Sequence, residues 1–175
     1  MSETGIWFER KFSFPVPVEL FPGVMTRLTN TPARLEDILR DQGREVLRVK
    51  RTEKWSAQEH AGHLLDLEPL WLARVEDYLS ANEQLTAADL TNRKTHEANH
   101  NQRPVNDIVA EFRAARQTLV TRVSELDDSV FSRAIPHPRL GTPMRLVDHL
   151  YFVAEHDDHH LGAISNLLGS GKTGL

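Results

Sequence analysis

The chain has 175 residues, of which 25 are acidic, 21 are basic and nine are histidine, and it contains no cysteine. This length predicts one domain with a sizeable core, and a net charge of -4 argues against a strongly basic nucleic-acid binder. The absence of cysteine excludes disulfides, thiolate zinc sites, iron–sulfur clusters and a cysteine nucleophile. Any metal ion must therefore be held by imidazole, carboxylate or water.

The sequence predicts neither a targeting signal nor a membrane span. Residues 1–11 lack the basic start and apolar core of an export signal. No apolar run approaches the roughly 20 residues that cross a bilayer, so we expect a cytoplasmic protein with no membrane partner. The clearest basic run, residues 48–51, is short and has acidic neighbours. We therefore expect no nucleic-acid partner.

Residues 1–18 are predicted to form an extended N-terminal arm. Pro15 and Pro17 lie two positions apart and disfavour a helix there. We expect the aromatic side chains of the arm to lie against the body of the protein or across a partner subunit; they are Trp7, Phe8, Phe12 and Phe14. This aromatic arm is the basis on which we expect a homodimer.

Apolar periodicity predicts four long amphipathic helices, over residues 19–42, 56–79, 104–126 and 144–168. The second has the best-marked start, because Ser56 and Glu59 fit a capping box. In the first, Pro32 predicts either a kink or a fresh start with Thr31 as the cap.

Four such helices in one domain predict an all-α fold, a four-helix bundle over residues 19–169 with a short C-terminal tail at 170–175. The two connections, 81–103 and 127–143, are long. They predict some crossover between helices rather than simple up-and-down hairpins. No alternating strand pattern is evident in the chain.

The last helix carries the sharpest chemical signal, His156 and His160 at positions i and i+4. At 100° per residue both border the apolar stripe of this helix, whereas His159 falls on its solvated side. Two imidazoles one turn apart on an inward-facing edge can hold one metal ion. The alternative is a pair of histidines hydrogen-bonded beside the core.

The second helix offers His60 and His63, and both lie within its apolar arc, so periodicity does not choose between them. Two carboxylates also fall on apolar faces, Glu68 on this helix and Asp157 on the last one. A buried carboxylate needs a partner because burial without one is costly. Glu68 is a candidate general base or outer-shell group, with a structural hydrogen bond as the alternative. Asp157 is a candidate to orient a metal-bound histidine or to pair with an arginine across a subunit interface, with partial exposure as the alternative.

The remaining histidines carry weaker signals. His96 and His100 also have i,i+4 spacing, but their segment is loop-like and predicts solvated side chains. His137 lies between two prolines and is expected in a turn. His149 is expected to pack in the core.

Three segments together resemble the DinB-like (DinB/YfiT-like) metalloenzyme family. The first contains the family's Trp-Ser helix start followed by Gly-His-Leu, and the last contains its His-x-x-x-His. Their order and roughly ninety-residue separation are more specific than any fragment alone, and the resemblance extends from about residue 20 to 168. The segments are WSAQEHAGHLLDLE at 55–68, NQRPVNDIVAEFRAAR at 101–116 and HPRLGTPMRLVDHLYFVAEHDDHHLGAI at 137–164.

The resemblance implies an up-down-down-up bundle and a divalent metal ion held by three histidines. Matched motif by motif, these are His63, His156 and His160, so the resemblance selects His63 over His60. Imidazole ligands suit zinc or nickel, with iron and manganese as alternatives.

The resemblance also implies chemistry on a small molecule. Members are linked to S-transfer from small thiols such as bacillithiol or mycothiol and to maleylpyruvate isomerisation, and others are described as metal-dependent hydrolases. Because this chain has no cysteine, a thiol would enter as a low-molecular-weight cosubstrate. We expect either thiol transfer or a hydrolysis in which Glu68 or Asp157 manages protons. In both cases we expect the 81–103 and 127–143 loops to select the substrate. A non-catalytic, dimeric metal-binding or stress-related bundle is the alternative.

Overall fold

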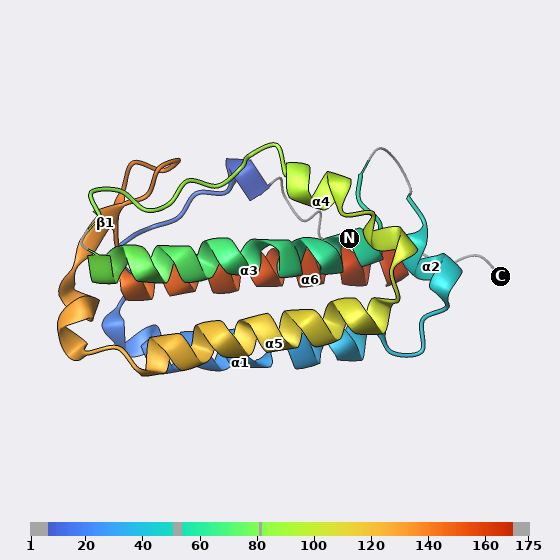
Figure 1. Ribbon diagram of the computed structural model, residues 1–175, viewed down its shortest axis with the longest axis horizontal. Coiled ribbons are helices and arrows are strands. Elements are labelled where there is room, and N and C mark those ends of the chain that lie inside the picture. Colours follow the sequence, from blue (N-terminus) through green and yellow to red (C-terminus); the bar gives the residue numbers. More distant parts are fainter. Residues whose placement is uncertain (1–6, 51–53, 81, 170–175) are drawn as a thin grey trace.

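A computed structural model of the protein describes residues 7–50, 54–80 and 82–169, and four long helices dominate it (Figure 1). The all-α four-helix bundle predicted from the sequence is confirmed. The predicted tail at 170–175 lies outside the described residues. The long helices are α1 (Phe21–Leu39), α3 (Ala57–Ser80), α5 (Val105–Ser124) and α6 (Leu146–Gly169).

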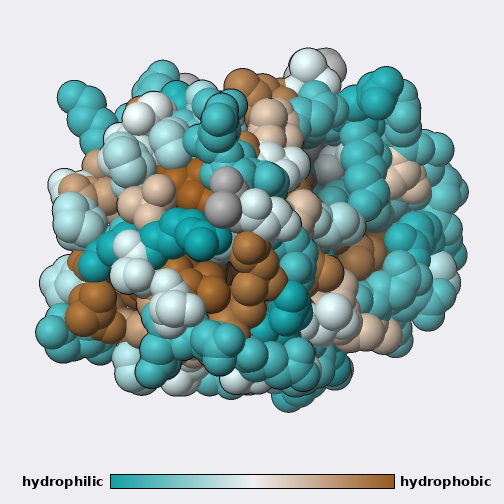
Figure 2. Space-filling view, turned by 60° about the vertical axis from the view of Figure 1, so that its left-hand side comes forward, coloured by the Kyte–Doolittle hydropathy of each residue, from teal (hydrophilic) through white to brown (hydrophobic). Residues whose placement is uncertain are grey.

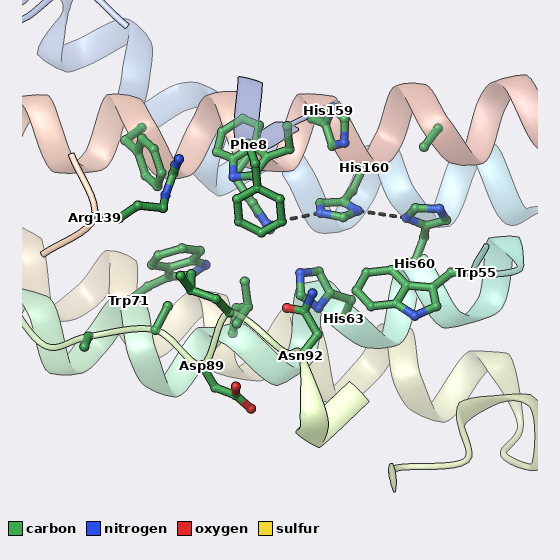
Figure 3. Close-up of a pocket in the computed structure, with 18 of the residues that line it drawn as sticks. Phe8, Trp55, His60, His63, Trp71, Asp89, Asn92, Arg139, His159 and His160 are labelled. Atoms are coloured by element: carbon green, nitrogen blue, oxygen red, sulfur yellow. Dashed lines mark hydrogen bonds between the residues drawn. The ribbon is translucent and has the colours of Figure 1, made fainter. Parts of the chain in front are cut away.

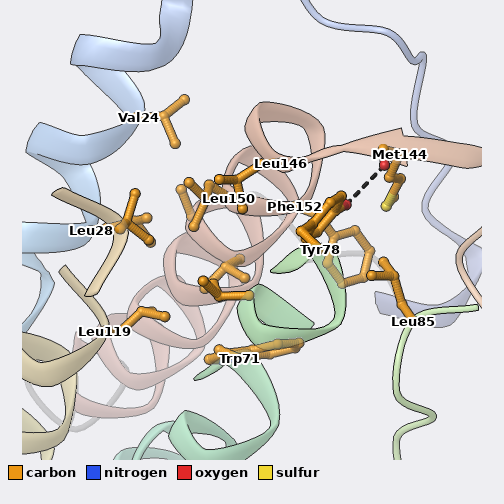
Figure 4. Packing of buried hydrophobic residues seen from close by; sticks show 14 of the residues in the cluster. Val24, Leu28, Trp71, Tyr78, Leu85, Leu119, Met144, Leu146, Leu150 and Phe152 are labelled. Carbon is orange, nitrogen blue, oxygen red and sulfur yellow. Dashed lines mark hydrogen bonds between the residues drawn. The ribbon is translucent and has the colours of Figure 1, made fainter. Parts of the chain in front are cut away.

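The four helices run up, down, down and up, and the two core clusters demonstrate this order. One cluster contains the beginnings of α1 and α6 and the ends of α3 and α5 (Figure 4), and the second contains the four opposite ends. Helices α1 and α6 therefore run one way and α3 and α5 the other. Each cluster draws on all four helices: Val24, Trp71, Leu119 and Leu150 belong to the first, and Leu35, Leu64, Phe112 and Ile164 to the second.

Local sequence explains where the helices begin and how they continue. Helix α3 follows the predicted capping box: N of Ser56 donates to Oε2 of Glu59 at 2.8 Å, and N of Glu59 donates to Oγ of Ser56 at 3.1 Å. Helix α1 continues through Pro32. A fresh start capped by Thr31 is therefore wrong, and Thr31 is instead buried inside the bundle.

Short elements lie between the long helices, and the sequence patterns did not reveal them. They include an antiparallel hairpin that begins in the 127–143 loop and ends at Arg145, and its strands of three residues are too short for alternation to be recognised. The short elements are η1 (Trp7–Glu9), η2 (Val18–Leu20), α2 (Arg44–Arg48), α4 (Arg93–Glu97), η3 (His100–Gln102), η4 (Asp128–Ser132), β1 (Ala134–Pro136) and β2 (Pro143–Arg145).

Residues 7–18 of the predicted N-terminal arm lie against the bundle, and residues 1–6 lie outside the described part of the chain. The ring of Trp7 contacts the rings of Phe12 and Phe152 edge-on, with centroids 5.3 and 5.2 Å apart. Near the end of the arm, N of Val16 donates to Oδ1 of Asp148 at 2.7 Å and fixes the arm to α6. Because Trp7 and Phe12 pack on Phe152 of α6 in the same chain, they give no separate support to a homodimer, which stays a prediction.

Apolar side chains reach the surface in separate areas. In Figure 2, which brings the hairpin end forward, brown apolar residues are interspersed with teal hydrophilic ones. Among the described residues, no helix combines the length and apolar character needed to cross a bilayer. The large exposed apolar side chains belong to several elements and do not define one docking face; they are Phe8, Val18, Leu20, Val46, Val49, Leu79 and Leu90.

Candidate metal centre

Three buried histidines from two helices meet at the α3–α6 contact: His63 on α3, and His156 and His160 on α6. One ring nitrogen of each lies within 4.8 Å of the others. The Nε2 atoms of His156 and His160 are 3.1 Å apart, because these residues stand one turn apart on the same face of α6. The structure thus brings together the three histidines that the family resemblance selected. Their role as metal ligands stays a prediction.

The donor set fits a divalent ion. Burial lowers the pKa of His63 to about 3. Burial, together with the neighbouring histidines, also lowers the pKa of His156 and of His160 well below the usual value. The rings are therefore neutral near pH 7 and offer lone pairs. Two nitrogens that each bind one ion at about 2.1 Å stand about 3–3.5 Å apart, which agrees with the spacing of the two Nε2 atoms.

Two further side chains orient the rings of the cluster. Nδ1 of His63 lies 2.9 Å from Oγ1 of Thr95 in α4, and Nδ1 of His160 lies 2.8 Å from Nδ1 of His60 (Figure 3). A hydrogen bond to the second ring nitrogen fixes the tautomer and leaves Nε2 for an ion. Periodicity did not distinguish His60 from His63. In the structure His60 contacts Nδ1 of His160, on the side of that ring away from His156.

A buried histidine fixes the segment that carries Thr95, which corrects a prediction. His100 is 1% exposed rather than solvated, and its Nε2 lies 2.8 Å from Oδ2 of Asp66 on α3. A Cβ on Gly62 would lie 2.2 Å from Cγ of His100, so the ring packs where only glycine leaves room. The loop-like composition of this segment concealed the role of His100, because one buried side chain leaves no periodic signal.

The other histidines divide between core, surface and pocket. His149 packs in the core and His96 is exposed, as expected. His137 lies in the hairpin turn, where it is only 2% exposed and its Nε2 accepts from Nη1 of Arg74 at 3.1 Å. His159 is half-buried rather than solvated, and it lines the pocket described next.

The three histidines open on a pocket of about 570 Å³ beside α3 and α6 (Figure 3). Both loops that were predicted to select a substrate line it, through residues 87–90 and 92 of the first and 137–139 of the second. A small molecule in this pocket would lie beside the histidines with its body against aromatic side chains. The apolar lining includes Trp7, Phe8, Trp55, Leu67, Trp71 and Phe152.

Glu68 and Asp157 lie behind the pocket, in the middle of the bundle, and neither lines it. Both are ion-paired with Arg116, which is 1% exposed: Nη2 lies 2.6 Å from Oε1 of Glu68, and Nη1 lies 2.5 Å from Oδ2 of Asp157. The arginine partner of Asp157 therefore comes from its own chain. Burial raises the pKa of Glu68 to about 7, an effect to which the charge of Asp157 adds and which Arg116 opposes.

These charges belong to a polar layer that takes one side chain from each long helix. Oγ1 of Thr31 on α1 donates to Oδ2 of Asp157 at 2.9 Å, and Arg116 on α5 joins Glu68 on α3 to Asp157 on α6. Along each helix, the residue of this layer separates the buried residues that belong to the first core cluster from those that belong to the second. The layer thus fixes the register of all four helices directly behind the histidine cluster.

Fold and site together define a four-helix bundle with a three-histidine cluster that opens on a pocket of small-molecule size. The sequence profile of the DinB superfamily matches residues 27–164. The chain belongs to the DinB superfamily.

Two solved structures share the fold. YfiT from Bacillus subtilis, described as a probable metal-dependent hydrolase with an unusual four-helix bundle topology, aligns with a TM-score of 0.79 at 18% identity, over 93% of this chain and 94% of that one. A mycothiol-dependent maleylpyruvate isomerase aligns with a TM-score of 0.65 at 11% identity, over 87% of this chain and 66% of that one. At these identities the likeness shows the fold alone. No functionally curated protein sequence matches this chain.

Proposed function

We propose that this protein is a metal-dependent enzyme that acts on a small molecule, with His63, His156 and His160 as the ligands of one divalent ion. The observation that carries the proposal is the position of three neutral imidazoles on the wall of a pocket of about 570 Å³. Three histidine ligands are typical of catalytic sites, which keep a coordination position open. A divalent ion held there supplies a Lewis acid and lowers the pKa of a coordinated water or thiol.

Thiol-dependent transfer is the reaction that the lining of the pocket favours. Asp89 contributes the only carboxylate among the described residues that line it, and this group is exposed and accepts hydrogen bonds from Thr91 and from N of Arg93. Hydrolysis commonly uses a carboxylate base next to the attacking water, whereas a thiol that ionises on entry needs none. The thiol would be a cosubstrate, since the chain has no cysteine. The mycothiol dependence named for one structural relative agrees with this proposal.

Hydrolysis is the second candidate, and His159 is the observation that favours it. This half-buried imidazole lines the pocket and forms no hydrogen bond within the described residues, so it can accept a proton from a water. The description of YfiT as a probable metal-dependent hydrolase agrees with this candidate. A direct role of Glu68 or Asp157 in proton handling stays a prediction.

Metal content tests the class of protein. We expect one divalent ion per chain after purification without added metal, with zinc or nickel favoured because imidazole suits both. His63→Ala and His156→Ala should each lower the metal content strongly, whereas His96→Ala, at an exposed position, should not. Unchanged metal content in both cluster variants would show that the proposed site is wrong.

A thiol panel tests the reaction. The metal-loaded protein is mixed with 1-chloro-2,4-dinitrobenzene and, in turn, cysteine, glutathione, bacillithiol or mycothiol. Thiol transfer predicts a rate that rises with thiol concentration and is lost in His156→Ala. A rate with ester substrates that ignores every thiol would replace transfer by hydrolysis. Light scattering on the same samples tests the predicted homodimer.

A further inference from the structure

Two arginines that line the pocket have no carboxylate partner among the described residues, although many arginines of this protein do. Arg74 is 1% exposed and Arg139 is half-buried, and both line the pocket. Neither forms an ion pair within the described residues, whereas Arg116, which is as deeply buried as Arg74, pairs with two carboxylates. Burying an unpaired cation is costly, so such a charge at a pocket points to an anionic ligand.

The donors of Arg74 are only partly used. Its Nε donates to the carbonyl of Thr86 at 2.8 Å and its Nη1 donates to Nε2 of His137 at 3.1 Å, which leaves Nη2 without a hydrogen bond within the described residues. Burial lowers the pKa of His137 to about 3, so this partner is neutral and does not compensate the charge. The charge of the nearby Asp77 offsets part of the cost of burying Arg74, but its carboxylate accepts hydrogen bonds from Thr86 and Asn82 and forms no ion pair with Arg74 among the described residues.

Among the described residues, the guanidinium of Arg139 forms fewer hydrogen bonds than that of Arg74. Nη2 of its guanidinium is buried and has no hydrogen-bond partner within the described residues. Its Cζ lies 5.4 Å from the ring centroid of Phe8, another residue of the lining. The turn that presents Arg139 is well defined, because N of Gly141 donates to the carbonyl of His137 at 2.8 Å and Gly141 adopts the positive φ of 66° that favours glycine. The turn therefore holds Nη2 of Arg139 in place, with no acceptor among the residues that the structure describes.

The two arginines lie at the same end of the pocket, away from Trp55. Arg74 follows His63 by eleven residues, about 16 Å along α3, and its side chain leans back toward the histidines because Cβ vectors of a helix point to its N-terminus. Its Cζ accordingly lies 5.4 Å from the ring centroid of Trp71. Figure 3 shows Arg139 at one end of the pocket and Trp55 at the other, with the histidines between them. In the same view the carboxylate of Asp89 is directed away from the pocket.

We propose that Arg74 and Arg139 form a carboxylate-binding subsite, which selects small molecules that carry a carboxylate at one end of an apolar body. Guanidinium groups bind carboxylates through charge-assisted hydrogen bonds, and a free donor on each arginine matches the two oxygens of one carboxylate. The aromatic wall between the subsite and the histidines covers the apolar body. The subsite deepens the proposed function, on which its role in substrate choice rests, because it leaves the other end of the substrate beside the histidine cluster.

Binding to the metal-free protein tests the subsite separately from the metal centre. Isothermal titration calorimetry on chelator-treated protein compares 4-phenylbutyrate with 4-phenylbutanamide, two probes of similar shape that differ in charge. Without the ion, a carboxylate cannot gain affinity by coordinating it. The variants are Arg139→Gln and Arg74→Gln, with Arg93→Gln as the control, because Arg93 is an exposed cation of the neighbouring segment that does not line the pocket.

We expect the native protein and Arg93→Gln to bind the carboxylate at least about tenfold more tightly than the amide. Arg139→Gln should abolish most of this preference and leave the affinity for the amide unchanged. Arg74→Gln should do the same if its circular dichroism and melting temperature are native; if it unfolds, Arg139→Gln decides. An equal affinity of the native protein for both probes, no binding of either, or a preference that survives in Arg139→Gln would overturn the subsite. Metal content measured on the same preparations reports separately on the proposed metal centre.

Discussion

Nδ1 of His60 lies 2.8 Å from Nδ1 of His160, on the side of that ring opposite the Nε2 that approaches His156. If Nε2 of His160 binds a metal ion, as proposed, that nitrogen carries no proton; Nδ1 then carries it and donates to His60. The two histidines of α3 thus occupy different positions: His63 belongs to the three-histidine cluster, and His60 contacts the Nδ1 side of one ring of that cluster.

Loss of His60 should weaken metal binding without removing a ligand. We expect His60→Ala to lower the affinity for zinc by about 10–100-fold, as is typical when the partner of a ligand is removed. His60→Gln keeps an acceptor and should lose less. Competition with a chromophoric chelator measures both, with the exposed His96→Ala as the control. If His60→Ala and His96→Ala bind zinc alike, His60 has no positioning role.

Gly62 should be irreplaceable for a steric reason. Because a Cβ there would lie 2.2 Å from Cγ of His100, Gly62→Ala must displace the ring and, with it, the segment that holds Thr95 against His63. We expect a loss of about 1–3 kcal/mol in unfolding free energy and a lower affinity for zinc.

Gly23 supplies the matched control for this substitution. It also lies in a helix, α1, but a Cβ there would meet no atom within 4 Å. Gly23→Ala should therefore stabilise the protein by up to about 1 kcal/mol, because alanine favours the helix. Urea denaturation compares the two variants. Equal stabilities of Gly62→Ala and Gly23→Ala would contradict the packing of His100 on Gly62.

The sequence predicted the parts of the protein that repeat a pattern. Long apolar periodicities located the four helices within a few residues, and the capping box placed the start of α3. The resemblance to the DinB-like family, not periodicity, selected His63 together with His156 and His160. Three features could not be predicted in this way: the short hairpin, the contact of Thr95 with His63 and the burial of His100. Each depends on contacts between segments that are separated in the sequence, which no local sequence pattern encodes.

One long-range contact did leave a signal that sequence reasoning missed. Glu68 and Asp157 were recognised as carboxylates on apolar faces, but their partner was not. Arg116 occupies a gap in the apolar face of α5, four residues after Phe112 and three before Leu119, both of which are buried. A cation at a core-facing position pairs with anions at core-facing positions, since burial would otherwise be costly.

The charge of Arg116 should matter far more than that of an exposed arginine on the same helix. Arg116→Met leaves two buried carboxylates without a cation, and we expect a loss of about 3–5 kcal/mol in unfolding free energy. Arg113 pairs with Glu36 at the surface, where both side chains are about half exposed, and Arg113→Met should cost no more than about 1 kcal/mol. Urea denaturation at pH 7 measures both. Similar small losses in the two variants would mean that the layer contributes little to stability.

The free energy of unfolding should fall in mild acid, and the buried His149 is one residue that causes this fall. This ring is fully buried near Trp71 and Tyr78. Burial, together with the charge of Arg74, lowers the pKa of His149 well below 6.5. The folded state therefore keeps the ring neutral, whereas the unfolded chain takes up a proton below pH 6.5. The stabilising contribution is present above that pH and is lost as the pH falls below it.

His149→Leu removes this proton uptake and keeps an apolar side chain in the core. At pH 5, about 1.5 units below the pKa of the unfolded chain, the group accounts for a loss of about 2 kcal/mol relative to pH 7.5. The stability of His149→Leu relative to the native protein should therefore rise by about that amount between pH 7.5 and pH 5. Urea denaturation with a chelator present measures the difference, and His96→Leu should track the native protein at both pH values. If His149→Leu also tracks the native protein, the buried ring must take up its proton in the folded state.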